Sequence, residues 1–291
     1  MGSQPAVVVT LDGTLHDPHA PLLHADDLAA VRGDGIFETL LIRDGAPCLL
    51  EAHLARLTQS AKMSDLPAPD LDRWRAAVAA ATAAWTANHE GEGVLRLVYS
   101  RGRESGSEPT AYATVGALAA RVAVARRDGV AAMLLDRGLS AGAADMPWLL
   151  AGAKTLSYAV NMAALRHAER HGAGDVIFVS SDGYVLEGPR STVVIAAGEP
   201  DNPVLLTPPP WYPILRGTTA QALFEVARNK GFDCDYRALR PADLGAAHGV
   251  WLISSITLAA RVHTLDGRPL PPSPLAAELS GLVDAAIVCD R

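Results

Sequence analysis

Short runs of Val, Ile and Leu alternate along the chain with longer stretches whose apolar residues recur every three or four positions. The short runs are typical of β-strands. They cover residues 6–11, 35–43, 94–100, 111–118, 130–137, 175–180, 184–188, 191–196, 203–207 and 249–255. The longer stretches predict helices over residues 51–63, 71–90, 157–172 and 218–231. Ser-Ser-Asp-Gly at 180–183 predicts a hairpin turn, because Asp-Gly readily adopts positive φ.

A stretch that becomes polar at its C-terminal end, residues 119–129, separates these elements into two groups. We expect a small N-terminal α+β domain over residues 1–120, an interdomain linker over 121–129 and a larger C-terminal α/β domain over 130–291. A length of 291 residues is sufficient for two such domains. The expected fold class is therefore α/β (α+β) with two domains.

Composition and charge narrow the class of protein. With 49% hydrophobic residues and a net charge of −7, the chain resembles an ordinary enzyme and lacks the basic field that nucleic acid or an anionic membrane requires. No run of 18 apolar residues predicts a membrane span. Cys48, Cys234 and Cys289 are far apart and form no Cys-x-x-Cys motif, so we expect no disulfide framework and a cytoplasmic location.

Lys154 is one of 3 lysines among 25 basic residues, and it follows the small, apolar sequence Leu-Leu-Ala-Gly-Ala. An ammonium group that loses its hydration has a lowered pKa, so the neutral, nucleophilic amine becomes accessible. Such an amine can form an imine with an aldehyde. The alternative is a surface lysine whose stem packs on the protein while its charge reaches water.

Glu187 ends an apolar strand directly before a Gly-Pro break, which is a suitable position for a carboxylate that points into a cleft. Its charge could keep a proton on the nitrogen of a heterocyclic ring. The alternative is an ion pair with Arg190, three residues away in sequence.

The Leu-Arg-Gly-Thr-Thr sequence at 215–219 precedes a predicted helix. Gly217 would let the backbone approach a ligand, and the amides of Thr218 and Thr219 would lie at the positive end of the helix dipole, where phosphate binds. The alternative is simple N-capping by threonine. Arg56, on the predicted helix 51–63, could clamp the same phosphate with two hydrogen bonds or lie in solvent.

The histidines do not predict a metal site. His16, His19 and His24 lack acidic or cysteine partners at metal-ligand spacing, and His167 and His171 lack a third ligand. We therefore expect no metal.

An amine, a strand-end carboxylate, a phosphate cradle and an arginine are what pyridoxal 5′-phosphate requires. With these residues the chain resembles the class IV aminotransferase family, fold type IV of the pyridoxal-phosphate enzymes, over nearly its whole length. The matching stretches follow the family's order: RGDGIFETL (32–40), EAHLARL (51–57), SRG (100–102), AGAKTLSY (151–158), GYVLEGPRS (183–191), LRGTT (215–219) and LISSITLAARVHTLDG (252–267).

The resemblance implies a role for each matching residue. Lys154 would be the Schiff-base lysine and Glu187 the acid that pairs with the pyridine nitrogen. The expected phosphate-binding residues are Arg56, Gly217, Thr218, Thr219 and Ser255. The family resemblance also implies a homodimer that acts on a small amino substrate.

Three activities share this scaffold: branched-chain aminotransferase, D-amino-acid aminotransferase and 4-amino-4-deoxychorismate lyase. The lyase releases pyruvate to leave 4-aminobenzoate, a precursor in folate biosynthesis. Phe37 stands where D-amino-acid aminotransferases have a tyrosine, and Ala159 stands where branched-chain enzymes usually have one. RGDGIF (32–37) and LVYSRG (97–102) look closer to the lyase. We therefore expect the lyase, with a class IV aminotransferase as the alternative and a non-catalytic pyridoxal-phosphate-binding relative as a third class.

Some features depart from the lyase pattern. Glu-Gly at 187–188 is as in the aminotransferases, Thr192 replaces an asparagine that many members have, and residues 103–112 differ from the lyase's glycine-rich loop. The expected substrate contacts are Phe37, Arg103, Tyr158 and Ile256, with Arg103 as the candidate for binding the substrate carboxylate.

Overall fold

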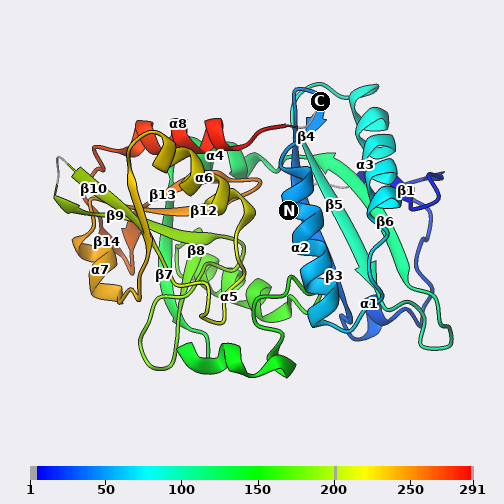
Figure 1. Cartoon of the computed structure of the whole chain (residues 1–291), viewed down its shortest axis with the longest axis horizontal. Coiled ribbons are helices and arrows are strands. Elements are labelled where there is room, and N and C mark those ends of the chain that lie inside the picture. Colours follow the sequence, from blue (N-terminus) through cyan, green and yellow to red (C-terminus); the bar gives the residue numbers. More distant parts are fainter. Residues whose placement is uncertain (1–4, 200–201, 290–291) are drawn as a thin grey trace. The chain divides into compact units, whose positions relative to one another are not determined.

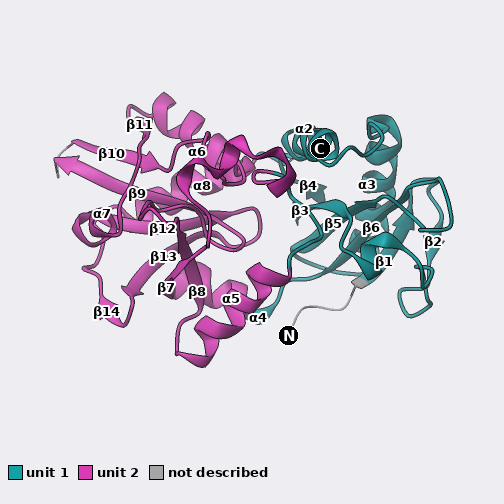
Figure 2. Cartoon of the chain, turned by 90° about the horizontal axis from the view of Figure 1, so that it is seen from below, with its two compact units in different colours: residues 1–120, 153–158, 288–291 teal, residues 121–152, 159–287 magenta. Residues whose placement is uncertain are grey.

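The computed structural model describes residues 5–199 and 202–289. The chain divides into two compact units (Figure 2). The first combines Met1–Ala120, Ala153–Tyr158 and Val288–Arg291, and the second combines Arg121–Gly152 and Ala159–Ile287. The chain therefore returns to the first unit twice, and one of the returning segments carries Lys154. The expected domain boundaries at 120 and 130 remain a prediction.

The first unit is an antiparallel sheet covered on one face by helices. Its strand order is β2-β1-β6-β5-β3-β4, formed by β1 (Pro5–Thr10), β2 (Leu15–His16), β3 (Gly35–Arg43), β4 (Ala46–Pro47), β5 (Gly93–Ser100) and β6 (Thr110–Ala117). The helices are α1 (Leu28–Val31), α2 (Leu50–Met63) and α3 (Leu71–Thr86) (Figure 1). Leu40 of β3, Leu57 of α2 and Trp74 of α3 are fully buried in one core between sheet and helices. Asp70 caps α3 by accepting a hydrogen bond from Arg73 N.

The second unit is a larger mixed sheet with the order β11-β10-β9-β12-β13-β7-β8 and β14 paired to β13. Its strands are β7 (Val130–Asp136), β8 (Asp175–Val179), β9 (Thr192–Glu199), β10 (Asn202–Thr207), β11 (Asp233–Tyr236), β12 (Gly249–Ser254), β13 (Leu258–Leu265) and β14 (Arg268–Pro269). Its helices are α4 (Ala120–Asp128), α5 (Ala159–Arg170), α6 (Thr218–Asn229), α7 (Pro241–Ala246) and α8 (Ala276–Ala286). Two short 3₁₀ turns, Ala141–Asp145 and Pro147–Leu149, follow β7.

Both faces of this sheet carry buried apolar side chains. In β8, Val176 and Phe178 pack in a cluster with Ala168 of α5, whereas Ile177 between them packs in a cluster with Leu244 of α7. This division follows from the alternation of side chains along a strand. It also explains why the strand sequences are continuous apolar runs rather than alternating ones.

Several sequence predictions differ from the observed elements. Residues 184–188 are not a strand; Val185 makes an isolated bridge to Val179, and the chain turns at Gly183 with a φ of +87°. Residues 121–129, expected as a linker, lie mostly in helix α4. Helix α8, which follows the Pro-rich sequence at 270–274, was not predicted.

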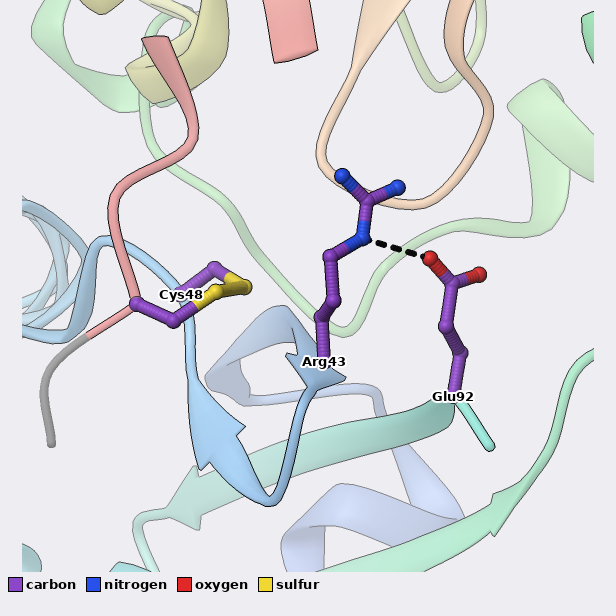
Figure 3. The surroundings of a disulfide bond; sticks show 4 residues. Arg43, Cys48 and Glu92 are labelled. Atoms are coloured by element: carbon purple, nitrogen blue, oxygen red, sulfur yellow. Dashed lines mark hydrogen bonds and ion pairs between the residues drawn. A yellow bond between two sulfur atoms is a disulfide. The ribbon is translucent and has the colours of Figure 1, made fainter. Parts of the chain in front are cut away.

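No disulfide framework was expected, but two of the three cysteines are bonded to each other. Cys48 and Cys289 are bonded, although 241 residues separate them in sequence (Figure 3). Beside the bond, Leu49 N donates to Val288 O at 2.9 Å, so the end of the chain pairs with the backbone just before α2. Sequence spacing could not reveal this pair, because distance along a chain does not determine distance in a fold. No described helix is long and apolar enough to cross a membrane.

Candidate active site

Lys154 lies on the edge of the first unit's sheet, where its segment runs alongside β3. Phe37 N donates to Lys154 O at 2.9 Å, and Leu156 N donates to Gly35 O at 2.8 Å. Lys154 N in turn donates to the Ser60 hydroxyl of α2 at 3.1 Å. The peptide groups on both sides of the lysine Cα are therefore fixed by hydrogen bonds to the strand and the helix.

Two aromatic rings face the lysine ammonium. Lys154 Nζ lies 4.4 Å from the centroid of the Phe37 ring and 5.4 Å from that of Tyr158, and the two rings meet edge to face at 5.3 Å. Contact of this kind stabilises a cation through the ring quadrupole while replacing part of its hydration. The structure thus brings together three of the residues singled out from the sequence, with two aromatic rings beside the amine.

Arg56, on the same helix as Ser60, contacts a buried carboxylate. Its Nε and Nη2 donate to the two oxygens of Glu38 at 2.8 and 2.7 Å, and His53 Nδ1 lies 2.8 Å from Glu38 Oε2. Burial raises the pKa of Glu38, but the charge and hydrogen bonds of Arg56 and His53 outweigh that effect and hold the pKa well below its usual range. The carboxylate is therefore ionised.

Sequence reasoning missed Glu38 and His53. The available signal was an acidic residue inside the apolar strand sequence GIFETLLIR, followed by a histidine and an arginine at i, i+3 on the next helix. Of the two interpretations of Arg56, the solvated helix residue is wrong, because its guanidinium is engaged with Glu38 and is only 12% exposed.

Glu187 belongs to the second unit, and its carboxylate meets the Leu-Arg-Gly-Thr-Thr sequence. Leu215 N donates to Glu187 Oε2 at 3.0 Å, while Glu187 O accepts from Phe178 N of β8 at 2.8 Å. Arg190, the alternative partner considered from the sequence, forms an ion pair with Asp175 at 3.5 Å. The structure therefore places the carboxylate next to the loop that leads into α6.

Helix α6 begins with the geometry of an anion site. Its N-cap is Gly217, a residue with no side chain that could cap the first-turn amides. A Cβ on Gly217 would lie 2.3 Å from Thr192 Oγ1, so glycine is the residue that fits. Thr218 and Thr219 are buried, and Thr219 Oγ1 donates to Ser255 Oγ at 3.4 Å. Threonine N-capping, the alternative considered from the sequence, is therefore wrong.

The remaining substrate candidates lie apart in the sequence and have different partners. Ile256 O accepts from Arg126 Nε at 3.1 Å, which ties the turn after β12 to helix α4. Arg103 pairs with Asp26 at 2.9 Å on the turn between β5 and β6, so part of its charge is already offset.

Comparisons with a family model and with individual known proteins point to the same family. The model of the family described as amino-transferase class IV matches residues 35–265. A protein of Mycobacterium tuberculosis named bifunctional aminodeoxychorismate lyase / D-amino acid transaminase is 71% identical over 289 residues, covering 98% of this chain and 100% of the relative.

Solved structures agree in fold. The pyridoxal-phosphate-bound form of a hypothetical aminotransferase from M. tuberculosis is 72% identical, with a TM-score of 0.96 over 98% of this chain and 100% of the other. A fold IV transaminase from Curtobacterium pusillum is 40% identical, with a TM-score of 0.89 over 96% of this chain and 97% of the other.

Proposed function

The chain belongs to the class IV aminotransferases, and from this premise we propose that it is a pyridoxal 5′-phosphate-dependent 4-amino-4-deoxychorismate lyase that forms pyruvate and 4-aminobenzoate. The family and the α/β fold class expected from the sequence are confirmed. The observation that carries the proposal is the full-length similarity, at 71% identity, to a relative named for this lyase activity.

The residues present fit the cofactor. Phosphate suits the start of α6, where Gly217 leaves room for an anion to approach the first-turn amides and the hydroxyls of Thr219 and Ser255 lie 3.4 Å apart. The family resemblance further implies Arg56 as a guanidinium ligand of the phosphate and Lys154 as the amine that bonds to the aldehyde. Each donor type matches the group that it would bind.

When bound, pyridoxal 5′-phosphate bonds to amines through its aldehyde carbon, and its protonated ring withdraws electrons from the substrate Cα. Glu187 would keep the proton on the ring nitrogen, and its own orientation is fixed by Leu215 N. Lys154 Nζ would first hold the cofactor covalently and then, as the free amine, accept a proton from the substrate. Phe37 and Tyr158 would exclude water from this amine, which favours its neutral form.

D-amino-acid transamination is the second candidate function. It is favoured by the relative's name, which joins both activities. It is disfavoured by Phe37, which has no hydroxyl to offer a substrate carboxylate. A non-catalytic binder would need neither a lysine for proton transfer nor a carboxylate to maintain the electron sink, so Lys154 and Glu187 argue for an enzyme.

We also propose a homodimer in the cytoplasm. Large apolar side chains are exposed in residues 146–149 and 160–162 of the second unit, with Trp148 exposed to 74% and Val160 to 54%. Exposed apolar groups at this density are typical of surfaces that a partner covers. The location is proposed because a phosphorylated cofactor and a dicarboxylate substrate do not cross membranes unaided.

The test is a pair of assays on the holoenzyme. With 4-amino-4-deoxychorismate we expect pyruvate and 4-aminobenzoate in equal amounts. With D-alanine and 2-oxoglutarate, transamination would give pyruvate and glutamate, so 4-aminobenzoate is the diagnostic product. Lys154→Ala should abolish both reactions, whereas Lys62→Ala, an exposed lysine in the last turn of α2, should alter neither. Absence of 4-aminobenzoate from an enzyme that transaminates readily would overturn the lyase proposal.

A further inference from the structure

Glu38 is a charged residue in an apolar core. It is fully buried on β3 beneath α2, among the side chains that pack the first unit. Its neighbours on the same face of the strand are Ile36, Leu40 and Ile42, all completely buried. A buried ion pair is commonly no more stabilising than apolar residues of the same volume, because both charges lose their hydration. The presence of this carboxylate therefore calls for a role other than stability.

The contacts of Glu38 define one orientation of Arg56. Two parallel hydrogen bonds, at 2.8 and 2.7 Å, engage the edge of the guanidinium formed by Nε and Nη2. A planar fork held in this way cannot rotate without breaking both bonds. The other edge, formed by Nη1 and Nη2, consequently points in a fixed direction away from the carboxylate.

We propose that Glu38 is a positioning residue for Arg56, which it holds ready to bind the cofactor's phosphate through the Nη1–Nη2 edge. The inference rests on the proposed function, in which Arg56 is a phosphate ligand. An arginine side chain normally loses much rotamer freedom when it binds an anion. Here the loss has occurred before the ligand arrives, so the bond to phosphate is not weakened by it.

His53 also helps to hold the Glu38 carboxylate in place. Burial lowers its pKa, the charge and hydrogen bond of Glu38 oppose that shift, and the charges of Arg56 and Lys154 add to it, so the imidazole is neutral near pH 7. Since the carboxylate of Glu38 can only accept, the proton of the neutral ring must lie on Nδ1, which then donates at 2.8 Å. Two helix residues thus hold the carboxylate from the same side.

The same face of α2 also reaches the lysine. His53, Arg56 and Ser60 are at i, i+3 and i+7, and Ser60 Oγ accepts the Lys154 amide. This gives a matched control, because Ser60→Ala alters the support of the lysine but leaves the Glu38–Arg56 fork intact.

The experiment compares two ligands of the apoprotein: pyridoxal 5′-phosphate and pyridoxal, which lacks the phosphate. The dissociation constant of pyridoxal divided by that of pyridoxal 5′-phosphate measures what the phosphate contributes to binding, and we call this quotient the ratio. In Glu38→Gln the amide offers one acceptor and places its NH₂ against the arginine donors. We expect the ratio to fall about 10- to 100-fold, the equivalent of one or more charge-assisted hydrogen bonds, with little change for pyridoxal. Ser60→Ala should leave the ratio unchanged.

Arg56→Gln separates this proposal from the proposed function. It should lower the ratio at least as far as Glu38→Gln does, and the double variant should show no further fall. If Arg56→Gln leaves the ratio unchanged, Arg56 is not a phosphate ligand and the proposed role fails. If Arg56→Gln lowers the ratio but Glu38→Gln weakens both ligands equally, Glu38 is merely structural and the positioning role is overturned.

Circular dichroism establishes whether Glu38→Gln is folded. Should it not fold, Arg56→Lys addresses the same point, because it keeps the positive charge but cannot form the fork. A fall in the phosphate ratio comparable to that of Arg56→Gln supports the proposal. A ratio at the wild-type value overturns it, since orientation would then be immaterial.

Discussion

Breaking the Cys48–Cys289 bond should destabilise the chain by more than most single substitutions do. The bond spans 241 residues, and the entire second unit lies within the loop that it closes. Loop-closure entropy for a loop of this length corresponds to about 5 kcal/mol at 25 °C. For a chain of 291 residues that unfolds in one transition, this is a fall of about 8 °C in Tm.

The assay is thermal unfolding of the wild type and of Cys48→Ser, each with and without a phosphine reductant. Reductant should lower the Tm of the wild type and leave that of Cys48→Ser unchanged, because the substitution has already removed the bond. Cys234→Ser, which alters the free cysteine on β11, should keep the wild-type response to reductant. Alkylation followed by intact mass should find one reactive thiol in the untreated wild type. A wild-type Tm that is insensitive to reductant while the bond is being reduced would refute the entropic reasoning.

Three further predictions concern the site. Gly217→Ala should weaken pyridoxal 5′-phosphate binding, because the added Cβ would lie 2.3 Å from Thr192 Oγ1; an unchanged dissociation constant in a cofactor titration contradicts this. Glu187→Gln should retain the cofactor but lower kcat about 100-fold or more, since a neutral amide does not hold the ring proton; equal kcat at saturating cofactor would argue against that role. The unfolding free energy should fall as the pH drops below 6.5, the ordinary pKa of histidine, because burial lowers the pKa of His53 and the unfolded chain therefore binds the proton first. His53→Gln should reduce this slope in urea unfolding between pH 5 and 7, and an identical slope would show that other groups cause it.

The sequence alone predicted those elements whose structure depends on residues close together in the chain. The strand predicted at 35–43 is β3 with the same bounds, because a run of β-branched and apolar residues bounded by Gly35 defines it without help from distant residues. The helix start at Thr218, where we propose the phosphate site, was also predicted from the sequence, since glycine followed by two threonines is a local signal. Likewise, Glu187 and the 215–219 loop were each identified from their own motifs, although their mutual hydrogen bond was not.

The sequence alone did not predict contacts between segments that are far apart in the chain. The partner of Arg56 is a glutamate 18 residues earlier, and nothing in the sequence states that this glutamate faces the helix rather than solvent. The cysteine pair depends on where the last residues of the chain come to lie. The segment that carries Lys154 joins a sheet whose other strands lie more than 30 residues away in sequence, so its partners follow only from the complete fold.

The return of residues 153–158 to the first unit has a consequence for making hybrids with relatives. A single crossover placed near residue 120 would combine the Lys154 segment of one parent with β3 of the other, so that the hydrogen bonds from Phe37 N and to Gly35 O would join mismatched sequences. Exchanging the small unit cleanly requires junctions at 120, 153, 158 and 288. Hybrid libraries that use all four junctions should yield soluble, cofactor-loaded proteins far more often than libraries made with a single crossover.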